Sequence, residues 1–157
     1  MSGRIERRLA ELTIQLPPPT PAFNSYVPWV RTGNLVFISG QGPFVDGKIP
    51  ARYRGRVGSD MPIERAQEAA RVTALSVLAQ LKHACAGDLD RVVRCVQLQG
   101  FVNCEPGYTE TPRVVNGGSD LIVAVFGDSG KHSRFAVGSH ALPENIVVEI
   151  AGIFEVG

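Results

Sequence analysis

The feature that most constrains the fold is a long run of small and aliphatic side chains that recur at helical spacing between Ile63 and Leu81. This spacing predicts an α-helix that buries one face against another layer of the protein. Asp60 is a candidate cap for the helix, and Pro62 fits its first turn. Ala86-Gly87 is typical of a helix end.

Five other segments have the apolar patterns of β-strands. They are residues 26–30, 35–38, 91–98, 134–140 and 146–156. A second helix is expected over 111–126. Asn116-Gly117-Gly118 is a point where it can bend or break, and Ser119 is the natural cap if the helix restarts there. The order strand, strand, helix, strand, helix, strand, strand predicts an α+β protein, with a mixed sheet and both helices on one face.

The N-terminal part, residues 1–21, is expected to form a short amphipathic helix followed by an extended proline-rich connector. The 157 residues suffice for one domain and are too few for two. A net charge of +1 argues against nucleic-acid binding by phosphate neutralisation. No apolar run approaches the roughly 20 residues of a membrane span. The charged N-terminus lacks a signal-peptide core, so a cytoplasmic protein is expected.

Two charged residues in apolar surroundings are the main candidates for chemistry. Arg134 shares a strand face with Ala136 and Gly138, whose small side chains leave room for a carboxylate on the guanidinium. The alternative is a surface arginine at a strand end. Glu149 interrupts the apolar run 146–154, and an isolated carboxylate there needs either an arginine partner or a role as general acid or base. The alternative is a glutamate on an exposed strand face.

The segment 131–156 is expected to be a β-hairpin centred near Pro143. In that register Arg134 pairs with Gly152 and Glu149 pairs with Val137. The two charged side chains are then offset by about 10 Å along the strands, at about 3.3 Å per residue. This offset excludes a simple cross-strand ion pair within one chain. Two arrangements remain open: the residues line one cleft, or they meet counterparts across a subunit interface.

Metal and thiol chemistry have weak support. The three cysteines are odd in number and form no Cys-x-x-Cys pair, which argues against a disulfide framework or a zinc site. Cys104 as a nucleophile is a minor alternative. His132 and His140 have no third ligand at metal spacing, so no metal site is expected. No nucleotide-binding loop or serine-hydrolase motif is present.

The chain resembles the Rid (YjgF) family, once called L-PSP endoribonucleases, from about Ala22 to the C-terminus. The most specific similarity is Arg-Phe-Ala-Val-Gly-Ser-His-Ala-Leu-Pro at 134–143 followed by Val-Glu-Ile at 148–150. Two further similarities are Gly-Asn-Leu-Val-Phe-Ile-Ser-Gly-Gln at 33–41 and Val-Asn at 115–116. The chain is most similar to a long-form subgroup with an added N-terminal helix.

This resemblance implies a chorismate-mutase-like fold of the bacillus type and a homotrimer with ligand sites in the clefts between subunits. It implies cofactor-free hydrolytic deamination of reactive 2-imino or enamine acids to 2-keto acids and ammonia. Arg134 would hold the substrate carboxylate and Glu149 would position the attacking water. The remaining pocket residues implied by the resemblance are Tyr26, Ser39, Asn116 and Ala136.

Three departures from the family pattern leave other functions open. Lys131-His132-Ser133 replaces the usual proline-containing lead-in to the arginine, Ala136 stands where many relatives have a cysteine or another small residue, and the loop 100–112 differs from that of short members. The alternative function is a trimer that binds a small carboxylate such as a 2-keto acid without turnover. Endoribonuclease activity and translation inhibition are less favoured, because the neutral chain shows no basic surface with stacking aromatic residues.

Overall fold

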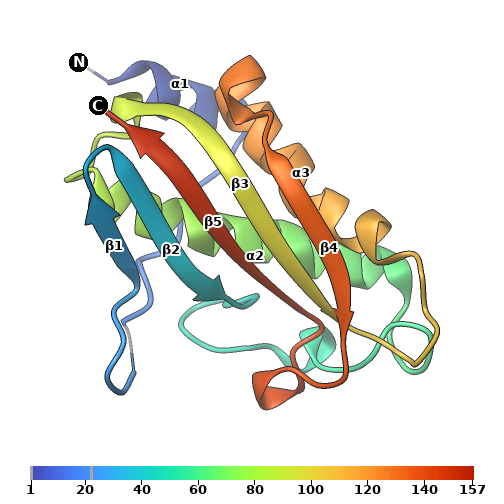
Figure 1. Ribbon diagram of the computed structural model, residues 1–157. Helices are drawn as coiled ribbons and strands as arrows, with labels where there is room; N and C mark the ends of the chain where they lie inside the picture. Colours follow the sequence, from blue (N-terminus) through green and yellow to red (C-terminus); the bar gives the residue numbers. More distant parts are fainter. Residues whose placement is uncertain (1, 22) are drawn as a thin grey trace.

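A five-stranded mixed sheet with helices packed on one face forms the body of the protein (Figure 1). The computed structural model describes residues 2–21 and 23–157. The helices are α1 (Arg4–Glu11), α2 (Ile63–Ala84) and α3 (Thr111–Phe126). The strands are β1 (Trp29–Thr32), β2 (Leu35–Gln41), β3 (Val92–Asn103), β4 (Ser133–Ser139) and β5 (Val148–Val156). The predicted α+β architecture and the N-terminal helix are confirmed.

The order of the strands is β1-β2-β5-β3-β4, so the predicted hairpin of the last two strands is wrong. β5 lies between β2 and β3 and is antiparallel to both, whereas β4 pairs with β3 in parallel. The physical reason is the α3 crossover, which returns the chain parallel to β3 in a strand–helix–strand unit. β3 is also longer than predicted: it continues through Phe101 to Asn103 and pairs along both of its edges.

The register nevertheless keeps the predicted offset between the two charged residues. Leu98 pairs with both Arg134 and Gly152, and Phe101 pairs with both Val137 and Glu149. Arg134 and Glu149 are therefore three residues apart along the strands and two strands apart across the sheet. With about 3.3 Å per residue and about 4.8 Å per strand, their Cα atoms are about 14 Å apart.

The predicted α2 stripe is buried between the sheet and α3, as in Ala66, Val77 and Leu81. Pro62, and not Asp60, occupies the N-cap of α2, because the Asp60 carboxylate accepts a hydrogen bond from the backbone N–H of Arg56 at 2.7 Å.

The predicted helix over 111–126 is confirmed, and α3 runs through its glycines without a break, so Ser119 lies inside the helix and does not cap a second half. A Cβ atom on Gly117 would overlap the backbone oxygen of Gln67 in α2. The glycine is therefore needed for close helix packing and does not end the helix.

The other side of the sheet, called the open face here, carries every second residue of β4 and β5 and is not covered by α2 or α3 (Figure 1). Phe37, Phe135 and Val137 are among its exposed apolar side chains. Phe101 and Phe135 meet edge to face on it, with ring centroids 5.6 Å apart. No helix in the described part of the chain is both long and apolar enough to cross a membrane.

Candidate functional site

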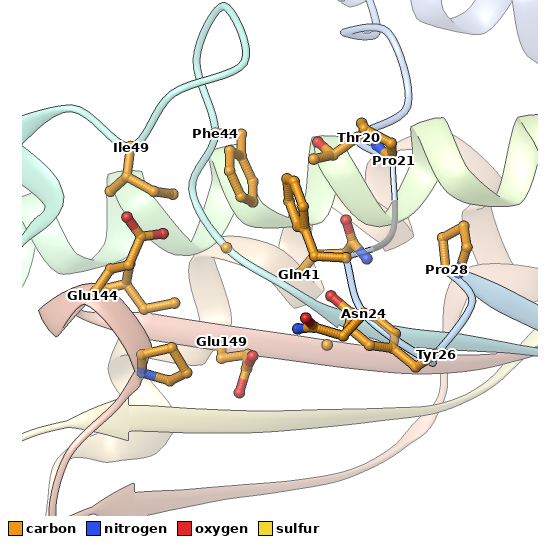
Figure 2. Close-up of a pocket in the computed structure, with 15 residues that line it drawn as sticks. Thr20, Pro21, Asn24, Tyr26, Pro28, Gln41, Phe44, Ile49, Glu144 and Glu149 are labelled. Carbon is orange, nitrogen blue, oxygen red and sulfur yellow. The ribbon is translucent and has the colours of Figure 1, made fainter.

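A cavity of about 360 Å³ lies at the open face, where β2 ends and β5 begins. Its walls come from the connector before β1, the loop after β2 and the turn before β5. Figure 2 shows Glu149 on β5, with Tyr26 and Asn24 on one side and Glu144 on the other. The connector that follows the proline run therefore folds back over the sheet and closes one wall of the cavity.

Glu149 is the ionisable group at the floor of this cavity. Burial raises the pKa of its carboxyl above the usual glutamate value. Among residues 2–21 and 23–157, it has no hydrogen-bond or ion-pair partner. A Cβ atom on Gly40 would lie 2.9 Å from both Cδ and Oε1 of Glu149, so the carboxylate rests directly on the backbone of β2. A raised pKa makes a carboxylate a stronger base, which suits it to take a proton from a water molecule and return it.

The Ser39-Gly40-Gln41 segment shapes the opposite wall. The β2–β5 register shifts between Ile38 and Gln41, so β2 bulges at this point. Gln41 is 6% exposed, and its Nε2 donates to the Ser39 carbonyl at 3.0 Å. The Ser39 hydroxyl donates to the Val27 carbonyl at 2.7 Å, which ties the connector to β2. Ser39 thus holds the connector in place beside the cavity, whereas Tyr26 lines the cavity itself.

Arg134 lies on the helix-facing side of the edge strand β4. Its Nη1 donates to Asn116 Oδ1 at 2.8 Å and to Ser119 Oγ at 3.1 Å, and both acceptors are on α3. A guanidinium has five N–H donors, of which Nη1 supplies two. The Nε and Nη2 donors have no partner among the described residues. The free Nε–Nη2 edge has the spacing of a carboxylate.

The predicted site residues therefore form two groups. Arg134, Asn116 and Ala136 lie together at the α3–β4 surface, where the Ala136 carbonyl accepts a hydrogen bond from Thr111 Oγ1 at 2.9 Å. The cavity on the open face brings Glu149 and Tyr26 together. Because the two groups are on opposite faces of the sheet, one chain does not bring its own Arg134 and Glu149 to one small ligand.

The sequence did not indicate every residue of these groups. Ser119 was assigned to a helix cap, yet it contacts Arg134 directly from within α3. Gln41 and Phe44 also line the cavity. The glycines at 40 and 42 were the available signal, because glycine permits close approach of a ligand or strand.

The possible metal ligands and the Cys104 thiol have the following surroundings. The described part of the chain contains no set of three or more His, Cys, Asp or Glu side chains that could hold a metal ion. Cys104 is buried, and its burial raises the pKa of the thiol. A raised pKa disfavours the thiolate that a cysteine nucleophile needs.

Comparison with known proteins identifies related chains. Residues 6–155 match the model of the family described as "YjgF/chorismate_mutase-like, putative endoribonuclease". The chain is 41% identical over 155 residues to Protein TCP17 of Trypanosoma cruzi, covering 98% of this chain and 95% of that one. The structure of Atu1372 from Agrobacterium tumefaciens is 44% identical, with a TM-score of 0.89 and coverage of 98% and 92%. E. coli TdcF with bound serine shares the fold at 22% identity, with a TM-score of 0.62 and coverage of 88% and 94%.

Proposed function

Because the chain belongs to the YjgF/chorismate-mutase-like (Rid) family, we propose that it hydrolyses small 2-imino or enamine acids to 2-keto acids and ammonia. One observation carries the proposal: Arg134 and Glu149 are oppositely charged residues that each lack a counter-ion among the described residues. Partly buried charges without partners are costly, and a ligand carboxylate and a water molecule would satisfy them.

The site is proposed to form between copies of the chain. The α3–β4 surface of one copy would bring Arg134 and Asn116 to the Glu149 cavity of the next. Because these two surfaces differ, their contact is head-to-tail, and such contacts form a ring when the rotation between copies closes. The resemblance implies a ring of three. The exposed apolar side chains of the open face, such as Phe135 and Val137, support burial against another copy.

In the proposed reaction, the free Nε–Nη2 edge of Arg134 binds the substrate carboxylate. Glu149 of the neighbouring copy takes a proton from water while the water oxygen bonds to the imine carbon. The C=N electron pair moves to the nitrogen, which takes the proton back from Glu149. The resulting carbinolamine passes its hydroxyl proton to the amino nitrogen, the C–N bond breaks as ammonia leaves, and the C=O bond forms. The sum is one imino acid and one water to one keto acid and one ammonia, with no cofactor.

The test is hydrolysis of 2-iminobutanoate and 2-iminopropanoate generated in place by an amino-acid oxidase, with semicarbazide trapping the imine that escapes. An active protein lowers semicarbazone formation in proportion to its concentration. Arg134→Ala should abolish this effect, because it removes the carboxylate partner. Arg65→Ala is the matched control, since Arg65 is exposed on α2, does not line the Glu149 cavity and is not a hydrogen-bond partner of Arg134. A purified wild-type protein that never exceeds the uncatalysed rate would refute the proposal.

A second candidate function is binding of a small carboxylate without turnover. The bound serine of TdcF favours it, because a protein of this fold there holds an amino acid. Calorimetric titration with 2-oxobutanoate would show saturable binding that Arg134→Ala removes and Arg65→Ala keeps. Binding without imine hydrolysis selects this function over the first.

A further inference from the structure

A buried hydroxyl and an imidazole lie directly behind the guanidinium of Arg134. Ser119 is 8% exposed, and its Oγ is 3.1 Å from Arg134 Nη1 and 3.0 Å from His132 Nε2. His132 Nδ1 is 2.6 Å from the Gly130 carbonyl oxygen. These four groups form one continuous line of hydrogen bonds from the edge strand β4 through α3 to the turn before β4.

When the imidazole of His132 is neutral, the chemistry of the end group sets the direction of every bond in this line. The Gly130 carbonyl can only accept, so Nδ1 of His132 carries the proton. In the neutral imidazole Nε2 is then an acceptor, and the Ser119 hydroxyl donates to it. The lone pairs of Ser119 Oγ are thereby left to accept from Arg134 Nη1. The donors run in one direction, from Arg134 to Ser119 to His132 to Gly130.

The far end of the line is rigid. A Cβ atom on Gly130 would lie 2.5 Å from the carbonyl oxygen of Ile122, so the turn packs directly on α3. Its carbonyl is therefore a fixed anchor for His132. The sequence differs from the family pattern at this place, because His132 belongs to the segment that replaces the proline-containing lead-in to the arginine.

We propose that Ser119 and His132 are positioning residues that set the rotation of the Arg134 guanidinium, so that its Nε–Nη2 edge faces the ligand carboxylate. This inference rests on the proposed role of Arg134 in carboxylate binding. Asn116 Oδ1 holds only one Nη1 proton, and Ser119 Oγ holds the other. Two acceptors on different helical turns fix the plane of the guanidinium, whereas one acceptor leaves it free to swing. Ser119 lies behind the guanidinium and is nearly buried, which suits an acceptor and not a nucleophile.

The functional experiment measures KM, kcat and the Kd for 2-oxobutanoate in Ser119→Ala and His132→Phe. We expect KM and Kd to rise about tenfold in Ser119→Ala, since one hydrogen bond to a charged group is lost, with kcat within about twofold of wild type. His132→Phe should give a smaller rise in the same direction. KM and Kd at wild-type values in Ser119→Ala, or a fall in kcat at unchanged KM, would overturn the proposal.

Ser133→Ala is the matched control. Ser133 is adjacent to His132 and Arg134, but its hydroxyl donates to the Val96 carbonyl at 3.0 Å and does not contact Arg134. It should leave KM and Kd at wild-type values. A rise equal to that of Ser119→Ala would mean that any change in this segment disturbs Arg134, and the specific positioning role would be wrong.

A second measurement separates this inference from the proposed function. Nitrogen-15 relaxation of the Arg134 Nε–H group reports the order of the guanidinium without any substrate. We expect an ordered signal in the wild type and in Ser133→Ala, and a mobile one in Ser119→Ala. That result supports the positioning role even if no imine hydrolysis or 2-keto acid binding is found, which would count against the proposed function alone. Equal order in all three proteins would overturn the inference while leaving the proposed function untouched.

Discussion

Gly40→Ala is a small change that should displace one side chain in the candidate site. The added Cβ would lie 2.9 Å from Cδ and Oε1 of Glu149 and 3.1 Å from its Cγ. Non-bonded carbon atoms prefer separations of about 3.5–4.0 Å, so the carboxylate has to move by about 0.6–1 Å. A misplacement of about 1 Å in a catalytic group can reduce the rate about 100-fold. We therefore expect kcat for imine hydrolysis to fall about 10- to 100-fold, with a smaller change in KM.

The fold should tolerate this substitution. Gly40 does not have the positive φ that strains other residues, and the atoms it would touch are at the end of a flexible side chain facing a cavity. Gly42→Ala is the matched control, because it adds a methyl group to the same cavity with Ile146 and Ile49 as neighbours at 3.3 Å. The assay is steady-state imine hydrolysis together with thermal unfolding. A well-folded Gly40→Ala protein with the kcat of the wild type would refute the reasoning that the position of Glu149 matters.

Three further predictions address single residues. Glu149→Gln should lower kcat about 10²- to 10⁴-fold, which is the usual contribution of a general base. The same substitution should raise the melting temperature at neutral pH, because the burial that raises the pKa of Glu149 also penalises its charged form. A scanning calorimetry profile with an unchanged or lower melting temperature would contradict the second part. Gly117→Ala should destabilise the protein by about 3 kcal/mol or more in urea unfolding, since the Cβ would overlap the backbone of Gln67, which cannot rotate away. A free energy of unfolding within experimental error of wild type would argue against the close α2–α3 packing. Asp90 accepts hydrogen bonds from the backbone N–H groups of Ile5 and Arg4 at 2.7 Å each, and these bonds lower the pKa of its carboxyl. The docking of α1 should therefore be intact above the ordinary aspartate pKa and should be lost as the pH falls through the lowered pKa of Asp90. The protection of the α1 amides against hydrogen exchange, relative to their intrinsic rates at each pH, should fall only in that acid range, and equal protection at all pH values would contradict the capping role.

Local patterns predicted much of the fold and failed where distant segments decide the structure. The α2 stripe depends only on local spacing and was found as predicted. The hairpin was the shortest connection between two strands, but β3 is 12 residues long and pairs on both edges, so β4 and β5 each join β3 instead of each other. Gly117 was expected to weaken a helix, whereas its role is set by α2, which is distant in the sequence.

In the candidate site, too, local patterns identified some residues, whereas contacts between distant segments decided the position of others. Arg134 and Glu149 were identifiable from their own surroundings, because an isolated charge in an apolar strand calls for a partner. Their three-residue offset is the same in the predicted hairpin and in the observed sheet, since both residues are aligned by β3, the strand that lies between β4 and β5. This odd offset places the two side chains on opposite faces, because side chains alternate along each strand. Which of the two faces the helices cover was not predictable from local patterns. The contact of Ser119 with Arg134 depends on the position of α3 against β4, so it could not be predicted from the sequence either.

The central claim is that Arg134 of one copy and Glu149 of another form one site. Mixing two inactive variants, Arg134→Ala and Glu149→Gln, tests it directly. After the two proteins are unfolded and refolded together in equal amounts, a random ring has an intact Arg134 beside an intact Glu149 at about one quarter of its sites. We predict recovery of about 25% of wild-type activity in the mixed rings, with no more than about 1% in either variant refolded alone. Absence of recovery in rings shown to contain both variants would contradict a shared site.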